Sequence, residues 1–376
     1  MPYSAYPDLW EYLKHTEKHV VMYGMGNGAD KILAVAETKG IAIEDFFASD
    51  GFVRGHSFHG KRVLSYSEAK QKYGADNMIV LLSFASSLPD VMQNILRIAG
   101  ECELYAPDVP VFGDNLFDSA FYSEHKQQFD AARALLADKE SVRVFDCIIA
   151  YKLSGDLKYL LDAENDPDES FTKILPSDTF ETVIDLGAYN GDSARALAPY
   201  AKNLKTIYTL EPDARNYRKL CAYAEEETRF AVIPMQYAAW DEDTVLYFDA
   251  SGNRNAGAAQ NTSGILLPRA GKIKEVEARS VDSLFGDARC DYIKFDVEGS
   301  EQKALLGCRR TIAAHAPALL VSCYHRSEDL YLLPQLLHDI RPDYRLYLRR
   351  FRYFPAWDIN LYAISSTNFD KSRICS

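Results

Sequence analysis

Short apolar runs alternate with amphipathic segments in two separate stretches of the chain. In the first stretch, helices are expected within 1–18 and at 29–39 and 88–100, and strands are expected at 19–23, 45–50, 78–84 and 101–107. The same alternation returns after residue 181, with expected strands at 182–186, 206–210, 231–237, 244–248, 292–297 and 318–324. Strands that alternate with helices predict a parallel, doubly wound α/β sheet in each stretch.

A different pattern separates these two stretches. Between about 111 and 175, apolar residues follow helical spacing without a strand-like run, which predicts two or three bridging helices. The chain ends in "YRLYLRRFRYF…DINLYAIS", which reads as two antiparallel strands. Because 376 residues exceed the usual size of one core, we expect a smaller α/β domain at 1–110, a helical connector at 111–178 and a larger α/β domain at 179–376.

Composition and charge narrow the class of protein. A net charge of −12 argues against a general nucleic-acid binder. The longest apolar run, 78–85, is too short to cross a bilayer, and the N-terminus lacks the layout of a signal peptide. Seven scattered cysteines are typical of free thiols in a reducing compartment. We therefore expect a cytoplasmic enzyme that acts on a small molecule, without a nucleic-acid or membrane partner, and a homo-oligomer is one assembly compatible with the sequence.

A glycine-rich turn, "VIDLGAYNGD" at 183–192, opens the second α/β stretch. Gly187 and Gly191 bracket the turn, and Asp185 lies at the end of the expected strand, where open sheets bind ligands. A carboxylate there suits a cationic ligand, such as the amino group of S-adenosylmethionine (SAM), better than an anionic pyrophosphate. Glu211 follows 24 residues after Gly187 and is predicted to bind a ribose diol, the alternative being a helix cap or a surface acid.

The end of the third expected strand offers a further cofactor contact. Ala238 and Ala239, followed by Trp240 and Asp241, would leave room for a flat adenine with an acid near its amino group. The alternative is that these residues belong to the core.

Charged residues gather on the expected strand 292–297. Lys294, Asp296 and Glu298 alternate with apolar residues, so they would share one face and form a catalytic or metal-binding edge. The alternative is a Lys294–Asp296 pair with Glu298 as a helix cap. His325 ends the next strand, and its usual pKa near 6.5 suits a general base, although a hydrogen-bonded strand-end histidine is equally compatible. With no second cluster of oxygen ligands visible, no metal site is predicted.

Several motifs together resemble one family. "VIDLGAYNGDSA", "LEPD", "YIKFDVEGSE…ALLG", "PALLVSCYHRSEDL" and "YRLYLRRF" resemble, in the same order over about 180–365, the FkbM-like SAM-dependent methyltransferases. The resemblance implies a seven-stranded class I methyltransferase sheet with an antiparallel final pair, SAM as cofactor, and O-methylation of a hydroxyl on a sugar, nucleotide sugar or natural product. A departure is Tyr189-Asn190 within the turn. The predicted cofactor-binding residues are Asp185, Gly187, Asn190, Gly191, Glu211, Ala239 and Trp240, and the predicted catalytic residues are Asp296, Glu298 and His325.

An earlier glycine-rich turn, "VVMYGMGNGADK" at 20–31, has the dinucleotide-binding pattern G-x-G-x-x-A. Gly24 and Gly26 form the turn, Asp50 closes the next strand, and Lys31 would suit a phosphate. Residues 1–110 are thus predicted to form a Rossmann-like domain that binds a nucleotide-like group or packs structurally. Two alternatives to a methyltransferase follow: a nicotinamide-dependent sugar oxidoreductase or epimerase, for which no Tyr-x-x-x-Lys is convincingly placed, and a non-catalytic nucleotide-binding scaffold.

Two other segments carry weaker predictions. The Gly-, Asn- and Ala-rich segment 250–272 is predicted to contact substrate, the alternative being a hairpin insertion. The cationic run near the C-terminus either contacts an acidic substrate or protects an edge strand from aggregation, the second being favoured; it comprises Arg345, Arg349, Arg350 and Arg352.

Overall fold

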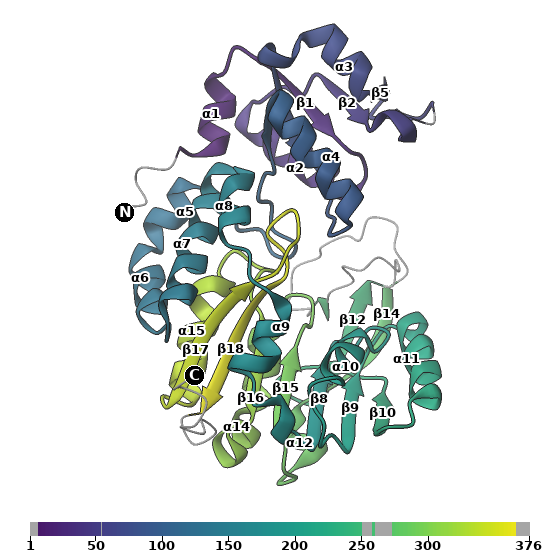
Figure 1. The fold of residues 1–376 in the computed structure, drawn as a ribbon, viewed down its shortest axis with the longest axis vertical. Helices are drawn as coiled ribbons and strands as arrows, with labels where there is room; N and C mark the ends of the chain where they lie inside the picture. Colours follow the sequence, from purple (N-terminus) through teal and green to yellow (C-terminus); the bar gives the residue numbers. More distant parts are fainter. Residues whose placement is uncertain (1–6, 54, 250–257, 260–272, 366–376) are drawn as a thin grey trace.

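The computed structural model describes residues 7–53, 55–249, 258–259 and 273–365. A parallel sheet and a larger, mainly parallel sheet lie one above the other, and helices of the middle part of the chain pack along one side (Figure 1). One cluster of buried apolar side chains runs through all three parts, with Val80 in the first sheet, Phe145 in the connector and Ile184 in the second sheet. The parts therefore share a core, and the domain boundaries proposed from the sequence stay a prediction.

The first sheet is parallel, with the order β5-β2-β1-β6-β7. Strands β1 and β6 are buried along nearly their whole length, as expected for parallel strands covered on both faces. The strands are β1 (His19–Tyr23), β2 (Asp45–Ala48), β5 (Leu64–Ser65), β6 (Met78–Leu82) and β7 (Glu103–Tyr105), with a small hairpin of β3 (Ser57–Phe58) and β4 (Lys61–Arg62). The helices are α1 (Leu9–His15), α2 (Asn27–Lys39), α3 (Tyr66–Tyr73) and α4 (Pro89–Glu101).

The connector contains more helices than the sequence pattern predicted. Four helices precede a short fifth one: α5 (Ser119–Glu124), α6 (Lys126–Ala134), α7 (Lys139–Ser154), α8 (Leu157–Asp162) and α9 (Pro167–Glu169). Aspartates at the N-caps of α5, α7 and α8 accept backbone N–H bonds and fix where these helices start.

The cationic run attaches this connector to the second sheet. Arg349 pairs with Asp138 at 2.7 Å, and Arg350, fully buried, donates to the carbonyl oxygen of Leu160 at 2.7 Å. Arg352 lies 3.5 Å from Glu164. These three arginines bind residues of the connector. The sequence analysis had assigned the run to substrate contact or to edge protection, and neither assignment accounts for these contacts.

The second sheet has seven strands in the order β10-β9-β8-β15-β16-β18-β17. The first five are parallel, and β18 is antiparallel to both of its neighbours, which confirms the predicted methyltransferase-type fold with its antiparallel final pair. The strands are β8 (Thr182–Leu186), β9 (Thr206–Leu210), β10 (Ala231–Met235), β15 (Tyr292–Phe295), β16 (Ala318–Ser322), β17 (Tyr344–Arg350) and β18 (Ile359–Ser365). The helices are α10 (Asp192–Leu197), α11 (Ala214–Glu226), α12 (Val281–Phe285), α13 (Glu301–Leu306), α14 (Arg309–His315) and α15 (Asp329–Ile340).

A third sheet corrects one strand assignment. The predicted strand 244–248 is β12 (Thr244–Asp249), but it pairs antiparallel with β14 (Ile273–Arg279) outside the seven-stranded sheet. This sheet has the order β11-β14-β12-β13, with β11 (Ala238–Ala239) and β13 (Ala258–Ala259). Segment 250–272, predicted to contact substrate, lies outside the described residues except for 258–259. Among the described helices, none has both the length and the apolar character needed to span a bilayer.

Candidate active site

A cavity of about 540 Å³ opens at the carboxyl ends of the strands of the second sheet. Its walls come from the residues that follow β8, β9, β15 and β16, together with the hairpin of β17 and β18. The chain proceeds outward from β8 in one direction and from β15 in the other, so the cavity lies at the topological switch point of the sheet. Ligands of open α/β sheets bind at such points, and the volume is ordinary for a ligand site.

The glycine turn after β8 is shaped by contact with its neighbour. Gly187 has φ +82°, and a Cβ there would lie 1.8 Å from the carbonyl oxygen of Asp296, so only glycine lets the two turns meet. Gly191 packs against the ring of Tyr223 instead of lining the cavity. Asn190, also predicted to bind cofactor, is not part of the lining, whereas Tyr189 is. The positions of Gly191 and Asn190 therefore do not support the direct contacts with the cofactor that the sequence predicted.

Asp185 is a buried carboxylate in the cavity that lacks hydrogen-bond partners in the described part of the chain. Its side chain is 2% exposed, and neither carboxylate oxygen has a hydrogen-bond partner among the described residues. Nζ of Lys294 lies 3.6 Å from Oδ1. Burial raises the pKa of Asp185 to about 6, against the opposing effect of Lys294. A buried carboxylate with two free oxygens is costly unless a ligand with donors completes it.

Glu211 occupies the corresponding place at the end of β9. It is 6% exposed and accepts backbone N–H bonds from Tyr189 at 2.9 Å and Asp213 at 2.8 Å. Burial raises the pKa of Glu211 to about 7, although these two bonds lower it. Each oxygen accepts one of these bonds and retains a free lone pair, so the carboxylate can still accept from a pair of hydroxyl groups.

The predicted adenine wall divides into two parts. Ala239 lines the cavity together with Ala238 and Tyr237. Trp240 does not: it is buried in a separate apolar cluster with Leu246, and its carbonyl oxygen lies against Gly307. Asp241, the acid expected near the adenine amino group, instead pairs with Lys303 at 2.7 Å. The contact predicted for Trp240 is therefore corrected to a role in packing.

Strand β15 ends at Phe295, earlier than predicted, so Asp296 and Glu298 lie on the turn that follows it. Lys294 bridges the strands, with Nζ 3.6 Å from Asp185 and 3.3 Å from Asp296. Glu298 has φ +54°, a left-handed conformation that is unfavourable for a side chain other than glycine. Strand β15 and this turn together bring Lys294, Asp296 and Glu298 to one cavity.

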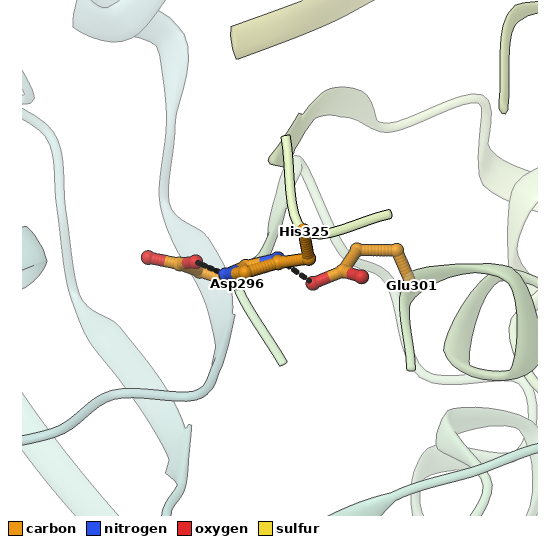
Figure 2. Close-up of side chains that lie close together, drawn as sticks. All are labelled: Asp296, Glu301 and His325. Atoms are coloured by element: carbon orange, nitrogen blue, oxygen red, sulfur yellow. Dashed lines mark ion pairs between the residues drawn. The ribbon is translucent and has the colours of Figure 1, made fainter. Parts of the chain in front are cut away.

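Both ring nitrogens of His325 lie near carboxylates. Nδ1 is 2.9 Å from Glu301, and Nε2 is 3.5 Å from Glu298 and 3.8 Å from Asp296. Figure 2 shows the ring between Asp296 and Glu301. Burial alone would lower the pKa of His325, but the carboxylates raise it to about 10, so the ring is a cation at neutral pH. Because a protonated imidazole cannot accept a proton, this geometry argues against the predicted role of His325 as the general base.

Glu298 is better placed for that role. Burial raises the pKa of Glu298 to about 7, with His325 lowering it and Asp296 raising it further. A group with a pKa near the working pH is suited to proton transfer. Both Glu298 and Asp296 line the cavity. The pKa of Asp296, however, is lowered in spite of its burial, because Lys294 and His325 favour its charged form.

Glu301 was missed by the sequence analysis. It is 1% exposed and accepts the backbone N–H of Val297 at 2.9 Å as well as facing His325. The acid three residues after Glu298, at the start of a helix, was the available signal. Ligand atoms of Asp296, Glu301 and His325 lie within 4.8 Å of one another, but a metal ion would have to displace the proton from the imidazole.

Aromatic and polar residues of the C-terminal hairpin form another wall that the sequence did not reveal. Tyr353, Trp357, Asp358 and Asn360 line the cavity. These residues reach the cavity because β18 pairs antiparallel with β16. No local sequence pattern predicts that pairing.

Two residues predicted for a nucleotide site at the first glycine turn, Gly24 and Asp50, contact other parts of the first sheet and its helices. A Cβ on Gly24 would lie 2.6 Å from the ring of Phe84, so this glycine serves packing. Asp50 accepts hydrogen bonds from both the backbone N–H and the hydroxyl of Ser67, each at 2.9 Å. It supports the first turn of α3 and lines neither this cavity nor the second cavity described below, so Asp50 is not placed as the ligand residue that the sequence pattern predicted. Gly26 begins α2 with φ +97° and faces open space.

Both a family sequence model and a solved structure are similar to this chain. Residues 185–353 match the sequence model of the Methyltransferase FkbM domain. The crystal structure of Methyltransferase FkbM from Methylobacillus flagellatus KT is similar with a TM-score of 0.68 and 21% identity, over 92% of this chain and 90% of that chain. At this identity, the match shows a shared fold, which extends over both sheets.

Other solved structures are more distant. Fibrillarin from Aeropyrum pernix, described in complex with natively bound S-adenosyl-L-methionine, has 14% identity and a TM-score of 0.33, over 50% of this chain and 69% of that chain. An rRNA methylase from Streptococcus thermophilus has 10% identity and a TM-score of 0.34, over 52% of this chain and 92% of that chain. No curated protein sequence matches the chain. The match to the family model and the seven-stranded sheet confirm, over residues 185–353, the resemblance to the FkbM methyltransferases found in the sequence.

Proposed function

We propose that this chain is a SAM-dependent methyltransferase that methylates a hydroxyl group on a sugar, nucleotide sugar or natural product. The observation that carries the proposal is Asp185, a buried carboxylate at the switch point whose oxygens have no hydrogen-bond partner among the described residues, with Nζ of Lys294 3.6 Å from Oδ1. A cationic amino group is the ligand that such a carboxylate favours. A reducing compartment, the cytoplasm, fits the six described cysteines, which are all free thiols.

Residues of the cavity fit the parts of SAM. Asp185 would accept from its amino group, Glu211 from its ribose hydroxyls, and Ala239 would leave room for its adenine. When bound, SAM supplies a methyl group already activated by a sulfonium. The protein's own task is therefore to orient the acceptor and remove its proton.

Glu298 is the proposed general base. It lines the cavity, and its pKa of about 7 allows it to take the proton from an acceptor hydroxyl. The cationic ring of His325, 3.5 Å away, favours the ionised form of Glu298 before the proton arrives. Glu301 holds that ring from the opposite side.

A nicotinamide-dependent reaction at the first turn has less support, since Asp50 is already bound to Ser67. Calorimetric titration of the full chain with SAM and then with NADH separates the two functions. Wild type is expected to bind SAM, and Glu211→Ala is expected to weaken that binding by about tenfold or more through loss of charge-assisted hydrogen bonds.

The matched control is Asp50→Ala, which removes the acid from the equivalent strand of the first sheet and should leave SAM binding unchanged. Saturable binding of NADH without binding of SAM would overturn the proposal.

A further inference from the structure

A second cavity, of about 420 Å³, opens at the carboxyl ends of the strands of the first sheet. Met25 follows β1, Ser83 and Phe84 follow β6, and Pro107 follows β7. Since β1 and β6 are neighbours at which the strand order reverses, this is the switch point of the first sheet. The turn that joins β17 and β18 extends from the second sheet toward the first (Figure 1), and two of its residues, Pro355 and Trp357, join the lining.

The two cavities have walls in common. Val111, Tyr324 and Trp357 line both of them. Tyr324 lies between Ser322, at the end of β16, and the site residue His325, and it packs against the His325 ring at a centroid distance of 4.1 Å. A molecule that fills the second cavity would therefore lie next to the proposed active site.

The charge of the second cavity is opposite to that of the first. Lys31, Lys152 and Arg326 contribute cationic groups, and Asp108 is the acid of the lining, paired with Lys152 at 2.8 Å. The first turn of α2 also lies at the cavity, where Asn27 and Gly28 carry N–H groups that lack partners within the helix.

Lys31 retains donor capacity. Its Nζ donates to the carbonyl oxygens of Pro110 at 2.9 Å and Val111 at 2.6 Å, which leaves one of three protons uncommitted. Burial lowers the pKa of Lys31, so an anion nearby would favour its charged form. Arg326 anchors its Nε on the carbonyl oxygen of Gly299 at 2.7 Å, directly after Glu298, and thereby links the two cavities.

We propose that the second cavity binds the phosphate-bearing part of the methyl acceptor, so that the acceptor hydroxyl reaches past Tyr324 and Trp357 into the first cavity. The inference rests on the proposed methyltransferase function and narrows its acceptor to a molecule of nucleoside-diphosphate or sugar-phosphate chemistry. Cationic side chains and a helix N-terminus suit the phosphates. The aromatic rings of Phe84, Tyr324 and Trp357 suit a base or a sugar.

Calorimetric titration of the full chain with inorganic pyrophosphate and with uridine 5′-diphosphate tests this inference. Wild type is expected to bind both probes, and Lys31→Gln and Arg326→Gln should each weaken binding by about tenfold. Tighter binding of the nucleotide than of pyrophosphate would show that the aromatic wall contributes. Lys70→Gln is the matched control, because Lys70 pairs with Glu101 on the surface of the first domain, away from the cavity lining.

Trp357 fluorescence locates the bound probe. Uridine 5′-diphosphate should change the emission of wild type, and Trp357→Phe should remove that change. Titration of SAM into the same proteins tests the methyltransferase proposal separately. Absence of binding by both probes, equal affinity in wild type, Lys31→Gln and Arg326→Gln, or an emission change that survives Trp357→Phe would overturn the inference, whatever SAM does.

Discussion

The two glycine-rich turns occupy the same place in two similar parallel sheets, yet their surroundings differ in charge. The turn after β8 is surrounded by the buried acids Asp185 and Glu211, whereas the turn after β1 opens beside Lys31 and Lys152. The shared backbone geometry provides an open strand end and a helix start. The side chains that border the turn, and not the glycines, distinguish an acidic cavity from a basic one.

The glycines of the two turns differ in the space around them, and substitution of Gly187 is expected to have the largest effect on stability. Gly187→Ala should lower the free energy of unfolding by about 4 kcal/mol or more, because its Cβ would overlap the Asp296 carbonyl oxygen at 1.8 Å. Gly26→Ala has open space and should cost about 2 kcal/mol from its backbone conformation alone. Urea denaturation of both variants measures the difference, and equal losses would remove the distinction between the turns.

The proposed base provides the next test. Glu298→Gln keeps the shape of the side chain but cannot accept the proton, so the rate of methyl transfer should fall by about 100-fold or more. With wild type, the rate should rise with pH up to about 7, as Glu298 ionises. Initial rates of S-adenosylhomocysteine release with a fixed acceptor measure both effects. A His325→Gln variant that alone abolished this pH dependence would assign the base to His325 instead.

The buried acids of the second turn should also affect stability. The pKa values of Asp185 and Glu211 are raised to about 6 and 7 in the folded chain, above ordinary values of about 4. The folded state thus binds protons more tightly, so these groups reduce stability as the pH rises from about 4 through 7.

Asp185→Asn removes one such cost and should stabilise the protein by about 1–3 kcal/mol near pH 8, while it weakens SAM binding. Thermal unfolding between about pH 5 and pH 8 measures this effect. A variant that is less stable than wild type at every pH would show that Lys294 offsets the burial of Asp185 completely.

The acid of the first turn should have the smallest effect. Asp50→Ala removes the acceptor for the Ser67 N–H in the first turn of α3 and should cost about 1 kcal/mol of stability. Denaturant unfolding measures that loss, and calorimetry should show unchanged binding of SAM. A loss of uridine 5′-diphosphate binding would restore Asp50 as a ligand residue.

Much of the secondary structure and the position of the acids in the first cavity could be predicted because their signals are local. Strands such as β6 and β8 are continuous apolar runs, and Asp185, Gly187 and Glu211 stand at fixed spacings from their ends. Trp240, Asp50 and the arginine run were misassigned because each makes its decisive contact with a distant or differently oriented segment.

By itself, the sequence determined the two α/β units and the acids at their strand ends, since periodicity and strand-end position depend on nearby residues. The methyltransferase-type sheet was predicted from the resemblance of the motifs to one family. Only the tertiary structure decided that His325 is a cation, because Glu298 and Glu301 had to be brought to it from another turn. It also decided that Val111, Tyr324 and Trp357 join two cavities of opposite charge. Both outcomes depend on the distances between residues that are far apart in the chain, because those distances set the electrostatic environment of a side chain and the groups it contacts.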